Sequence, residues 1–422
     1  MISLDNYFKI YPKVVGANTK SIITLEPKFS HWKIPEVEVK VFHSPVSYNS
    51  RQEYKRLEVK RDRNKLYIEG FFEEEQEHVI YIDIGNKNFS FSIYSVNDDL
   101  LMRIPYKGDL HIHTYYSDGL ESPSYVASSC RRIGLDFVAI TDHGKYFPSI
   151  EAIDTFKDLD LGFKIFPGEE VHPPNNPLHI VNFGGKFSIN ELFEREREKY
   201  NREVWEIEEK LKLEIPDIPE RYQLASSIWS FNKIREAEGL GILCHPFWRI
   251  KEGYYISERL LHLLYEKRVF DAVEIVGGYH ISELSSNNLQ MVYHYEKSKG
   301  ENIPVVGVTD AHGCDTGSLF GWYYTVVFSP SLELKDIIES IKLGYSVGVE
   351  AIPGRETRVY GSSRLVLFTL FLIREVFPIH DRICQEEGNF MMRHMMGKSY
   401  EDINYYKKDL DEFYSSIIRR YD

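Results

Sequence analysis

The chain has 422 residues, of which 43% are hydrophobic, so it is long enough to bury more than one core. Its formal net charge of −13 disfavours a nucleic-acid-binding surface, because such surfaces carry Lys and Arg against the phosphates. The four cysteines, Cys130, Cys244, Cys314 and Cys384, show no paired spacing, which favours a reducing compartment. The first residues lack the basic and then apolar pattern of a secretory leader, so we expect a cytoplasmic protein.

Residues 1–104 consist of short alternating runs such as SIITLEP, EVEVKVF and HVIYIDIG, separated by turn residues. A period of two places one face of each run in a core and the other in water, which predicts strands. The spacing of the runs predicts a small antiparallel β-sandwich domain.

From Tyr106 strand patterns alternate with helical ones, which predicts an α/β barrel over residues 105–352. Residues 188–239 read as a charged helical insertion, either a lid over the site or a solvated helical pair with a structural role. Residues 353–422 read as a helical C-terminal extension. Its apolar run from Leu365 meets Arg374 after nine residues, too few to cross a bilayer, so we expect a buried helix and no membrane partner. This helix is also a candidate surface for homo-oligomer formation.

Histidines and carboxylates recur directly after apolar runs along the predicted barrel. KGDLHIHTYYSDG contains His111 and His113, which lie two apart and therefore share one face of a strand, and Asp118 follows in the loop. The run FVAI is followed by Asp142 and His143.

Four later segments continue the pattern. GFKIFPGEEV supplies Glu169, LHIVNFGG places His179 before an apolar stretch, and GILCHPFW presents His245. IPVVGVTDAHG ends in Asp310 and His312. Six of the fifteen histidines therefore stand at predicted strand ends, beside three carboxylates. The carboxyl ends of barrel strands meet at one rim, so this joint pattern predicts a metal site there. Imidazole and carboxylate ligands without a thiolate suit zinc, manganese or iron better than calcium.

In order, these segments resemble the motifs of the PHP (polymerase and histidinol phosphatase) superfamily of metal-dependent phosphoesterases, over about residues 106–350. The resemblance implies a distorted barrel of seven β/α units that holds two or three divalent ions. The β-rich N-terminal domain before GDLHIHTYYSDG is also similar to the carbaryl-hydrolase-like branch, whose members cleave carbamate or carboxylic esters.

The resemblance also implies a ligand set. His111, His113, Glu169 and Asp310 would hold one ion, with Glu169 bridging to a second. The second ion would be held by His179 and His245, and a third by Asp118, His143 and His312. Glu169, Asp310 and His312 are further assigned to the catalytic step. His172 competes with His179, although two prolines beside it favour a loop.

Residues beyond these ligands are less clearly marked. Lys145 and Arg249 closely follow His143 and His245, so they are either phosphate-binding groups at the rim or solvated surface charges. Asp142 would orient an imidazole or cap a helix. Cys244 lies in an apolar run and is interpreted as a core residue.

Three functions fit this pattern. The first is a phosphoesterase for a small phosphorylated metabolite or nucleotide, acting through a hydroxide that the metals generate near neutral pH. The second is a carboxylic ester or carbamate hydrolase on the same scaffold, for which an apolar pocket would replace the cationic groups. The third is a metal-binding module without turnover, against which the intact ligand set weighs.

Overall fold

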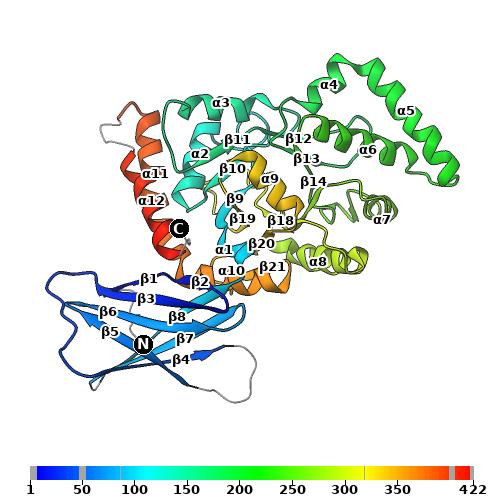
Figure 1. Cartoon of the computed structure of the whole chain (residues 1–422). Helices are drawn as coiled ribbons and strands as arrows, with labels where there is room; N and C mark the ends of the chain where they lie inside the picture. Colours follow the sequence, from blue (N-terminus) through cyan, green and yellow to red (C-terminus); the bar gives the residue numbers. More distant parts are fainter. Residues whose placement is uncertain (1–6, 47–53, 86, 318, 399–403, 419–422) are drawn as a thin grey trace. The chain divides into compact units, whose positions relative to one another are not determined.

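The computed structural model describes residues 7–46, 54–85, 87–317, 319–398 and 404–418. The chain forms two compact units (Figure 1). Unit 1 contains Met1–Ile104, Val366–Arg382 and Lys407–Asp422, and unit 2 contains Pro105–Leu365 and Ile383–Tyr406.

Unit 1 contains the β-rich N-terminal region. Its strands are β1 (Phe8–Tyr11), β2 (Val14–Gly16), β3 (Thr19–Pro27), β4 (Val39–Pro45), β5 (Lys55–Asp62), β6 (Lys65–Phe72), β7 (Gln76–Ile84) and β8 (Lys87–Val96). Their order is β1-β3-β6-β5-β4-β7-β8-β2, and among the described residues the strands pair antiparallel, except that β2 pairs parallel with β8. β5 pairs with both β4 and β6 and so joins two layers over one apolar core. The predicted sandwich is confirmed.

The C-terminal residues divide between the units. They form β21 (Arg358–Tyr360) and the helices α10 (Ser363–Glu375), α11 (Phe377–Met395) and α12 (Asn404–Ile417). Within unit 1, Lys13 Nζ lies 3.0 Å from Glu375 Oε2, and the rings of Tyr94 and Phe368 are 4.9 Å apart. Among the described residues, none of the helices combines the length and apolarity that crossing a membrane requires.

A seven-stranded ring forms the centre of unit 2. Its members are β9 (Ile104–Asp109), β10 (Phe137–Ala139), the bent pair β11 (Lys164–Phe166) and β12 (Gly168–Val171), β13 (Ile180–Phe183), β14 (Leu240–Leu243), β17 (Ala272–Gly277) and β18 (Val305–Val308). β11 pairs with β10, whereas β12 pairs with β13, so the bend carries the chain from one sheet to the other. A parallel bridge from Ile112 to Ala311 closes the ring between the ends of β9 and β18.

The ring is distorted because β13 runs against its neighbours. β13 pairs antiparallel with both β12 and β14, whereas β9–β10, β10–β11, β14–β17 and β17–β18 are parallel. A reversed strand begins where the others end. His179, which directly precedes β13, therefore lies at the same rim as the residues that follow the parallel strands. The predicted α/β barrel is confirmed, distortion included.

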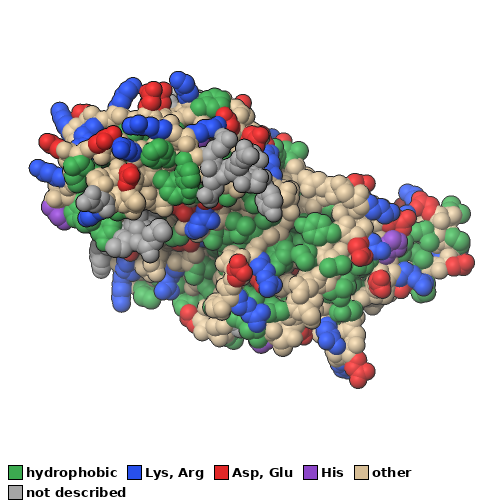
Figure 2. Space-filling view, turned by 90° about the horizontal axis from the view of Figure 1, so that it is seen from below, with side chains coloured by type: hydrophobic (Ala, Val, Ile, Leu, Met, Phe, Trp, Pro, Cys, Tyr) green, Lys and Arg blue, Asp and Glu red, His purple; other side chains and the backbone are tan. Residues whose placement is uncertain are grey.

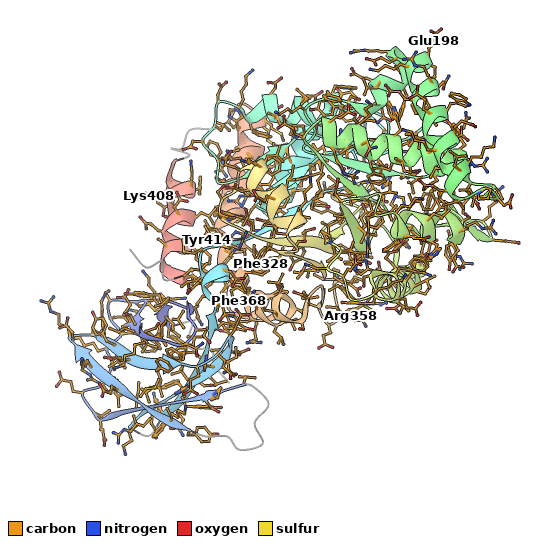
Figure 3. The ribbon with its side chains drawn as sticks, turned by 45° about the vertical axis from the view of Figure 1, so that its right-hand side comes forward. Glu198, Phe328, Arg358, Phe368, Lys408 and Tyr414 are labelled. Carbon is orange, nitrogen blue, oxygen red and sulfur yellow. The ribbon has the colours of Figure 1, made fainter. Side chains whose placement is uncertain are left out.

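The helical insertion comprises α4 (Ile189–Arg195), α5 (Arg197–Glu214) and α6 (Arg221–Glu236). Glu198 lies near its outer end (Figure 3). Its apolar side chains, among them Tyr200 and Trp229, belong to the same buried core as barrel residues. Packing of an amphipathic face stabilises these charged helices.

The remaining elements surround the ring or extend its sheet. They are α1 (Asp98–Leu101), α2 (Pro123–Arg132), α3 (Phe147–Phe156), β15 (Arg249–Ile250), β16 (Gly253–Tyr254), α7 (Glu258–Glu266), a 3-10 turn (Ile281–Glu283), α8 (Leu284–Ser298), β19 (Tyr323–Ser329), α9 (Leu334–Lys342) and β20 (Ser346–Glu350). Ser122 and Ser257 cap α2 and α7 by accepting hydrogen bonds from the backbone. On the face drawn in Figure 2, acidic and basic side chains are interspersed.

A buried ion network ties α11 to the barrel in unit 2. Arg131 Nε donates to Glu387 Oε2 at 2.6 Å, and its Nη1 donates to Asp136 Oδ1 at 3.1 Å. Removing one partner of a buried pair leaves the other charge uncompensated. We expect Glu387→Ala to lower the free energy of unfolding by about 3 to 5 kcal/mol in urea denaturation. The exposed neighbour Glu386→Ala is the matched control, and an equal effect of the two would contradict this assignment.

Unit 1 contains two buried histidines, His43 and His78, and burial of His78 in its neutral form makes this unit less stable in acid. Burial lowers the pKa of His78 to about 3 from the ordinary 6.5, and the His43 ring lies 5.8 Å away. Unfolded His78 takes up a proton below pH 6.5 while the folded ring stays neutral, so the free energy of unfolding falls as the pH drops toward 3.

We therefore expect His78→Gln to flatten the pH dependence of unit 1, by up to about 3 kcal/mol at pH 4 relative to pH 7. Hydrogen exchange of the β4 and β7 amides measures this unit separately. His31→Gln, at an exposed site, is the control. Parallel pH profiles for His78→Gln and the unsubstituted protein would refute the assignment.

Candidate metal centre

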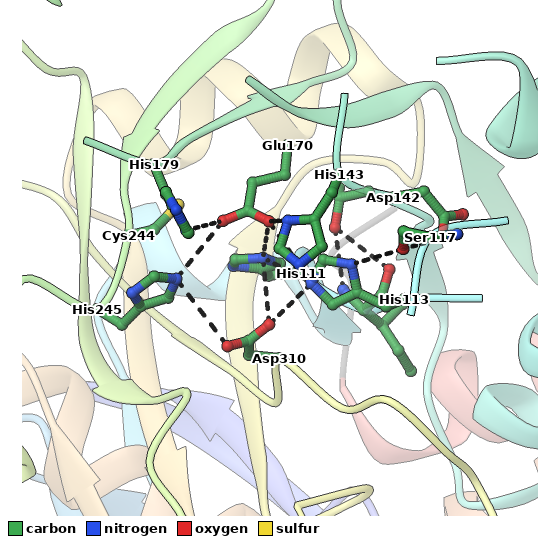
Figure 4. A network of polar contacts seen from close by, with 12 residues as sticks. His111, His113, Ser117, Asp142, His143, Glu170, His179, Cys244, His245 and Asp310 are labelled. Atoms are coloured by element: carbon green, nitrogen blue, oxygen red, sulfur yellow. Dashed lines mark hydrogen bonds and ion pairs between the residues drawn. The ribbon is translucent and has the colours of Figure 1, made fainter. Parts of the chain in front are cut away.

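Imidazoles and carboxylates from distant segments converge at the rim where the parallel strands end (Figure 4). Of the predicted metal ligands, all are present in this cluster except Glu169. Its members, grouped by ligand atoms within 4.8 Å of one another, are His111, His113, Asp118, His143, Glu170, His172, His179, His245, Asp310 and His312.

Glu170, at the end of β12, lies at the centre of the cluster. Its Oε1 is 2.8 Å from His179 Nδ1 and 3.5 Å from His245 Nε2. Its Oε2 is 3.6 Å from His111 Nε2 and contacts His143 Nδ1 closely. The side chain is fully buried, yet neither oxygen has a hydrogen-bond partner among the described residues. Glu170 is therefore placed where its carboxylate could hold a metal ion.

The prediction that Glu169 is a ligand is wrong. Consecutive strand residues point to opposite faces, and Glu169 points away from the cluster toward the start of α4. Its carboxylate accepts hydrogen bonds from Ser188 Oγ (2.7 Å), Asn190 Nδ2 (2.8 Å) and Asn182 Nδ2 (3.1 Å), and from the Ile189 amide. Both Glu169 oxygens accept hydrogen bonds from residues at the start of α4 or on β13, so Glu169 holds α4 against β12. The catalytic role predicted for Glu169 is therefore also wrong.

His111, His113 and Asp310 form a compact group. His113 Nε2 lies 2.8 Å from Asp310 Oδ1 and 3.2 Å from His111 Nε2. Asp310 adopts the left-handed backbone conformation, with φ of 52°. Such a conformation is costly outside glycine and persists where the surroundings impose it. Here the Asp310 amide donates to the His111 carbonyl at 2.8 Å, which joins the two segments.

Asp118, His143 and His312 form a more exposed group with His113. Asp118 Oδ1 lies 3.2 Å from His312 Nε2 and 3.4 Å from His143 Nε2. The Asp118 side chain is 57% exposed. This end of the cluster is therefore the one that solvent and ligands reach.

Two carboxylates that support the cluster have roles the sequence did not indicate. Glu274, in the apolar strand β17, accepts from His111 Nδ1 at 2.7 Å and from the His245 amide at 2.8 Å. It thereby leaves His111 Nε2 free to face the cluster. A lone carboxylate within an apolar strand is the signal that could have identified it.

Asp142 neither orients His143 nor caps a helix. It accepts hydrogen bonds from the amides and hydroxyls of Thr114 and Ser117, at 2.5 to 3.1 Å, and so shapes the loop that carries Asp118. Cys244 is buried, and burial raises the pKa of its thiol well above the ordinary value. It therefore stays protonated, as expected of a core residue.

The two predicted phosphate-binding residues lie outside the ligand groups. The Lys145 ammonium donates to the Tyr116 carbonyl in the loop next to Asp118. Arg249 is exposed on β15, in a short hairpin with β16 that follows His245. Both are on segments that continue from barrel strands, and their binding role stays a prediction.

The electrostatics keep the ligand atoms ready for cations. Burial opposes ionisation of Glu170, but interactions with the neighbouring imidazoles, His111 first, outweigh it and hold its pKa well below the ordinary value. The pKa of Asp310 is also lowered, by His111 and His113 against the effect of burial. Burial lowers the pKa of His179 to about 4, so that ring is neutral and its lone pair available near neutral pH.

These observations fit a divalent-metal centre. A buried carboxylate without hydrogen-bond donors is costly unless a positive group compensates it. Around Glu170 the neighbouring groups are imidazole nitrogens, which ligate metal ions in their neutral form. A donor set of imidazoles and carboxylates is the one that zinc, manganese and iron accept.

Residues 109–205 match the family model of the PHP domain, a segment that contains the site residues from His111 to His179. This segment of the chain therefore resembles a PHP domain. The remaining site residues, His245, Asp310 and His312, lie beyond the matched segment and join the cluster through β14 and β18.

Two curated proteins resemble parts of this chain. An uncharacterised protein of Methanocaldococcus jannaschii is 26% identical over 192 residues, covering 43% of this chain and 87% of that protein. The DNA polymerase/3'-5' exonuclease PolX of Bacillus subtilis is 42% identical over 53 residues, which is 13% of this chain and 9% of the polymerase. This chain therefore spans only a small part of the polymerase.

Two solved structures are similar to part of this chain. A two-domain protein of Bacteroides vulgatus containing a predicted PHP-like metal-dependent phosphoesterase is 16% identical, with a TM-score of 0.39 and coverage of 58% of this chain and 65% of that one. A proposed metal-dependent phosphoesterase of Bifidobacterium adolescentis is 18% identical, with a TM-score of 0.34, over 51% of this chain and 90% of that one.

The two adjacent glutamates should respond oppositely to substitution. Glu170→Gln removes the central charge, so we expect fewer bound metal ions per chain by elemental analysis. Glu169→Ala leaves several buried donors without an acceptor, so we expect metal-free protein to lose about 3 kcal/mol of unfolding free energy. If Glu169→Ala instead lost metal at unchanged stability, the orientation of β12 described here would be wrong.

Proposed function

We propose that this chain is a metal-dependent hydrolase, in the first place a phosphoesterase that acts on a small phosphorylated metabolite or nucleotide. The observation that carries the proposal is the buried Glu170 carboxylate, without hydrogen-bond donors and surrounded by imidazoles, in a segment that resembles a PHP domain. Divalent ions bound there would supply an acidified water and positive charge against the oxygens of the ester.

The chain's own residues would position the reactants. Glu274 holds the His111 ring through Nδ1, and the Asp142 carboxylate fixes the loop of Asp118, so the ligand atoms are preorganised. Lys145 and Arg249, on segments after β10 and β14, are the cations we assign to the substrate phosphate. The Lys145 ammonium would exchange its bond to the Tyr116 carbonyl for a phosphate oxygen.

A carboxylic ester or carbamate hydrolase is the second candidate, and aromatic rings beside the cluster favour it. The Trp248 ring lies 5.9 Å from His179 and 5.8 Å from His245, and Tyr255 lies 5.3 Å from His179. Tyr255 is buried and donates its hydroxyl proton to the Cys244 carbonyl, which leaves its ring as an apolar wall. Such a wall suits an uncharged, apolar acyl or aryl group.

A substrate panel separates the two candidates. Protein loaded with manganese or zinc is expected to hydrolyse p-nitrophenyl phosphate or bis(p-nitrophenyl) phosphate. His111→Ala and Asp310→Ala should each lower kcat/KM at least about a thousandfold, since a cation contributes several kcal/mol of transition-state stabilisation. His262→Ala, at a half-exposed surface site on α7, is the matched control.

Hydrolysis of p-nitrophenyl acetate or a naphthyl carbamate, with none of the phosphates, would replace the first candidate by the second. Less than about one bound ion per chain after loading would refute both.

A further inference from the structure

His172 is a histidine of the cluster that the family pattern leaves without a role. It follows β12 directly, and its ring is partly exposed, at 38%. Its Nε2 lies 2.8 Å from His143 Nδ1 and 3.5 Å from Glu170 Oε2. Its ring centroid is 4.3 Å from that of His179. His172 therefore stands beside His179 and does not compete with it for one place.

These four residues form a ligand group of their own. His143, Glu170, His172 and His179 each offer one atom, and the atoms lie within 4.8 Å of one another. The group shares His143 with the Asp118 group, but through the opposite ring nitrogen. His143 Nδ1 faces His172 and Glu170, whereas its Nε2 faces Asp118 Oδ1 at 3.4 Å. The two groups thus define different cation positions.

A hydrogen bond alone does not account for this arrangement. If His172 only accepted a proton from His143, His179 Nδ1 and Glu170 Oε1 would still face each other at 2.8 Å without the geometry of a hydrogen bond. A cation bound among them satisfies these atoms together.

The fold also anchors His172 in place. Its amide donates to Asn190 Oδ1 at 3.0 Å, and Asn190 Nδ2 donates to Glu169 Oε2 at 2.8 Å. Glu169, which points away from the cluster, therefore positions through Asn190 the loop that carries His172 beside Glu170. A solvated loop residue would need no such support.

We propose that His172 is a metal ligand which, with Glu170 and His179, forms a cation position on the open side of Glu170, completed by His143 through Nδ1. The proposal rests on the metal binding that the proposed function requires, but not on which ester is cleaved. It adds one ligand to the nine that the family pattern implies.

Metal titration of substrate-free protein tests this proposal. Apo protein is titrated with Mn²⁺ and Zn²⁺ by calorimetry, bound ions are counted by elemental analysis, and Co²⁺ absorption reports the ligand field. We expect His172→Ala to weaken one binding step at least about tenfold. The double variant His172→Ala/His179→Ala should lose the same single binding step as either substitution alone. The double variant His172→Ala/Asp118→Ala should lose two binding steps.

His262→Ala is the control, and His172→Gln replaces His172→Ala should the latter not fold. Titrations and Co²⁺ spectra identical to those of the unsubstituted protein would overturn the proposal. The proposal would also be overturned if His172→Ala and Asp118→Ala weakened the same binding step and the double variant lost no further step. His172 would then only orient His143. Because no substrate is present, these outcomes are independent of the ester assays, and either proposal can fail alone.

Discussion

The burial of one carboxylate without hydrogen-bond donors constrains the whole site. Glu170 is fully enclosed, and five imidazoles from four separate segments surround its carboxylate. A carboxylate in such surroundings is stable only if positive charge stays close to it. Every segment that reaches the rim must therefore present a nitrogen ligand, and the strand ends are arranged accordingly.

The distortion of the barrel serves this constraint. In a regular parallel barrel, residues before a strand lie at the opposite end from residues after it. Reversal of β13 brings His179, which precedes its strand, to the rim where His245 follows β14. Bridges between Ile112 and Ala311 and between His143 and Glu170 then hold the strand ends together at the cluster.

A layer of carboxylates outside the cluster holds the ligands in position. Glu274 orients His111, Asp142 shapes the Asp118 loop, and Glu169 fixes Asn190 and through it His172. Asp109 joins β9 to β18 by accepting from the Thr309 hydroxyl and amide, the latter at 3.1 Å. Ligands held in this way pay little reorganisation cost when cations bind, which is a requirement of efficient metal catalysis.

The sequence by itself determined the classes of element and most of the ligands. Alternating runs in residues 1–104 and the strand-end pairs His111 with His113 and Asp310 with His312 follow from backbone periodicity, which is local. The choice between Glu169 and Glu170 was decided only by tertiary structure. β12 is buried on both faces, so polarity does not alternate along it, and the direction of each carboxylate depends on where α4 packs. The role of Glu274 likewise depends on a contact with His111 across 163 residues, which no local pattern encodes.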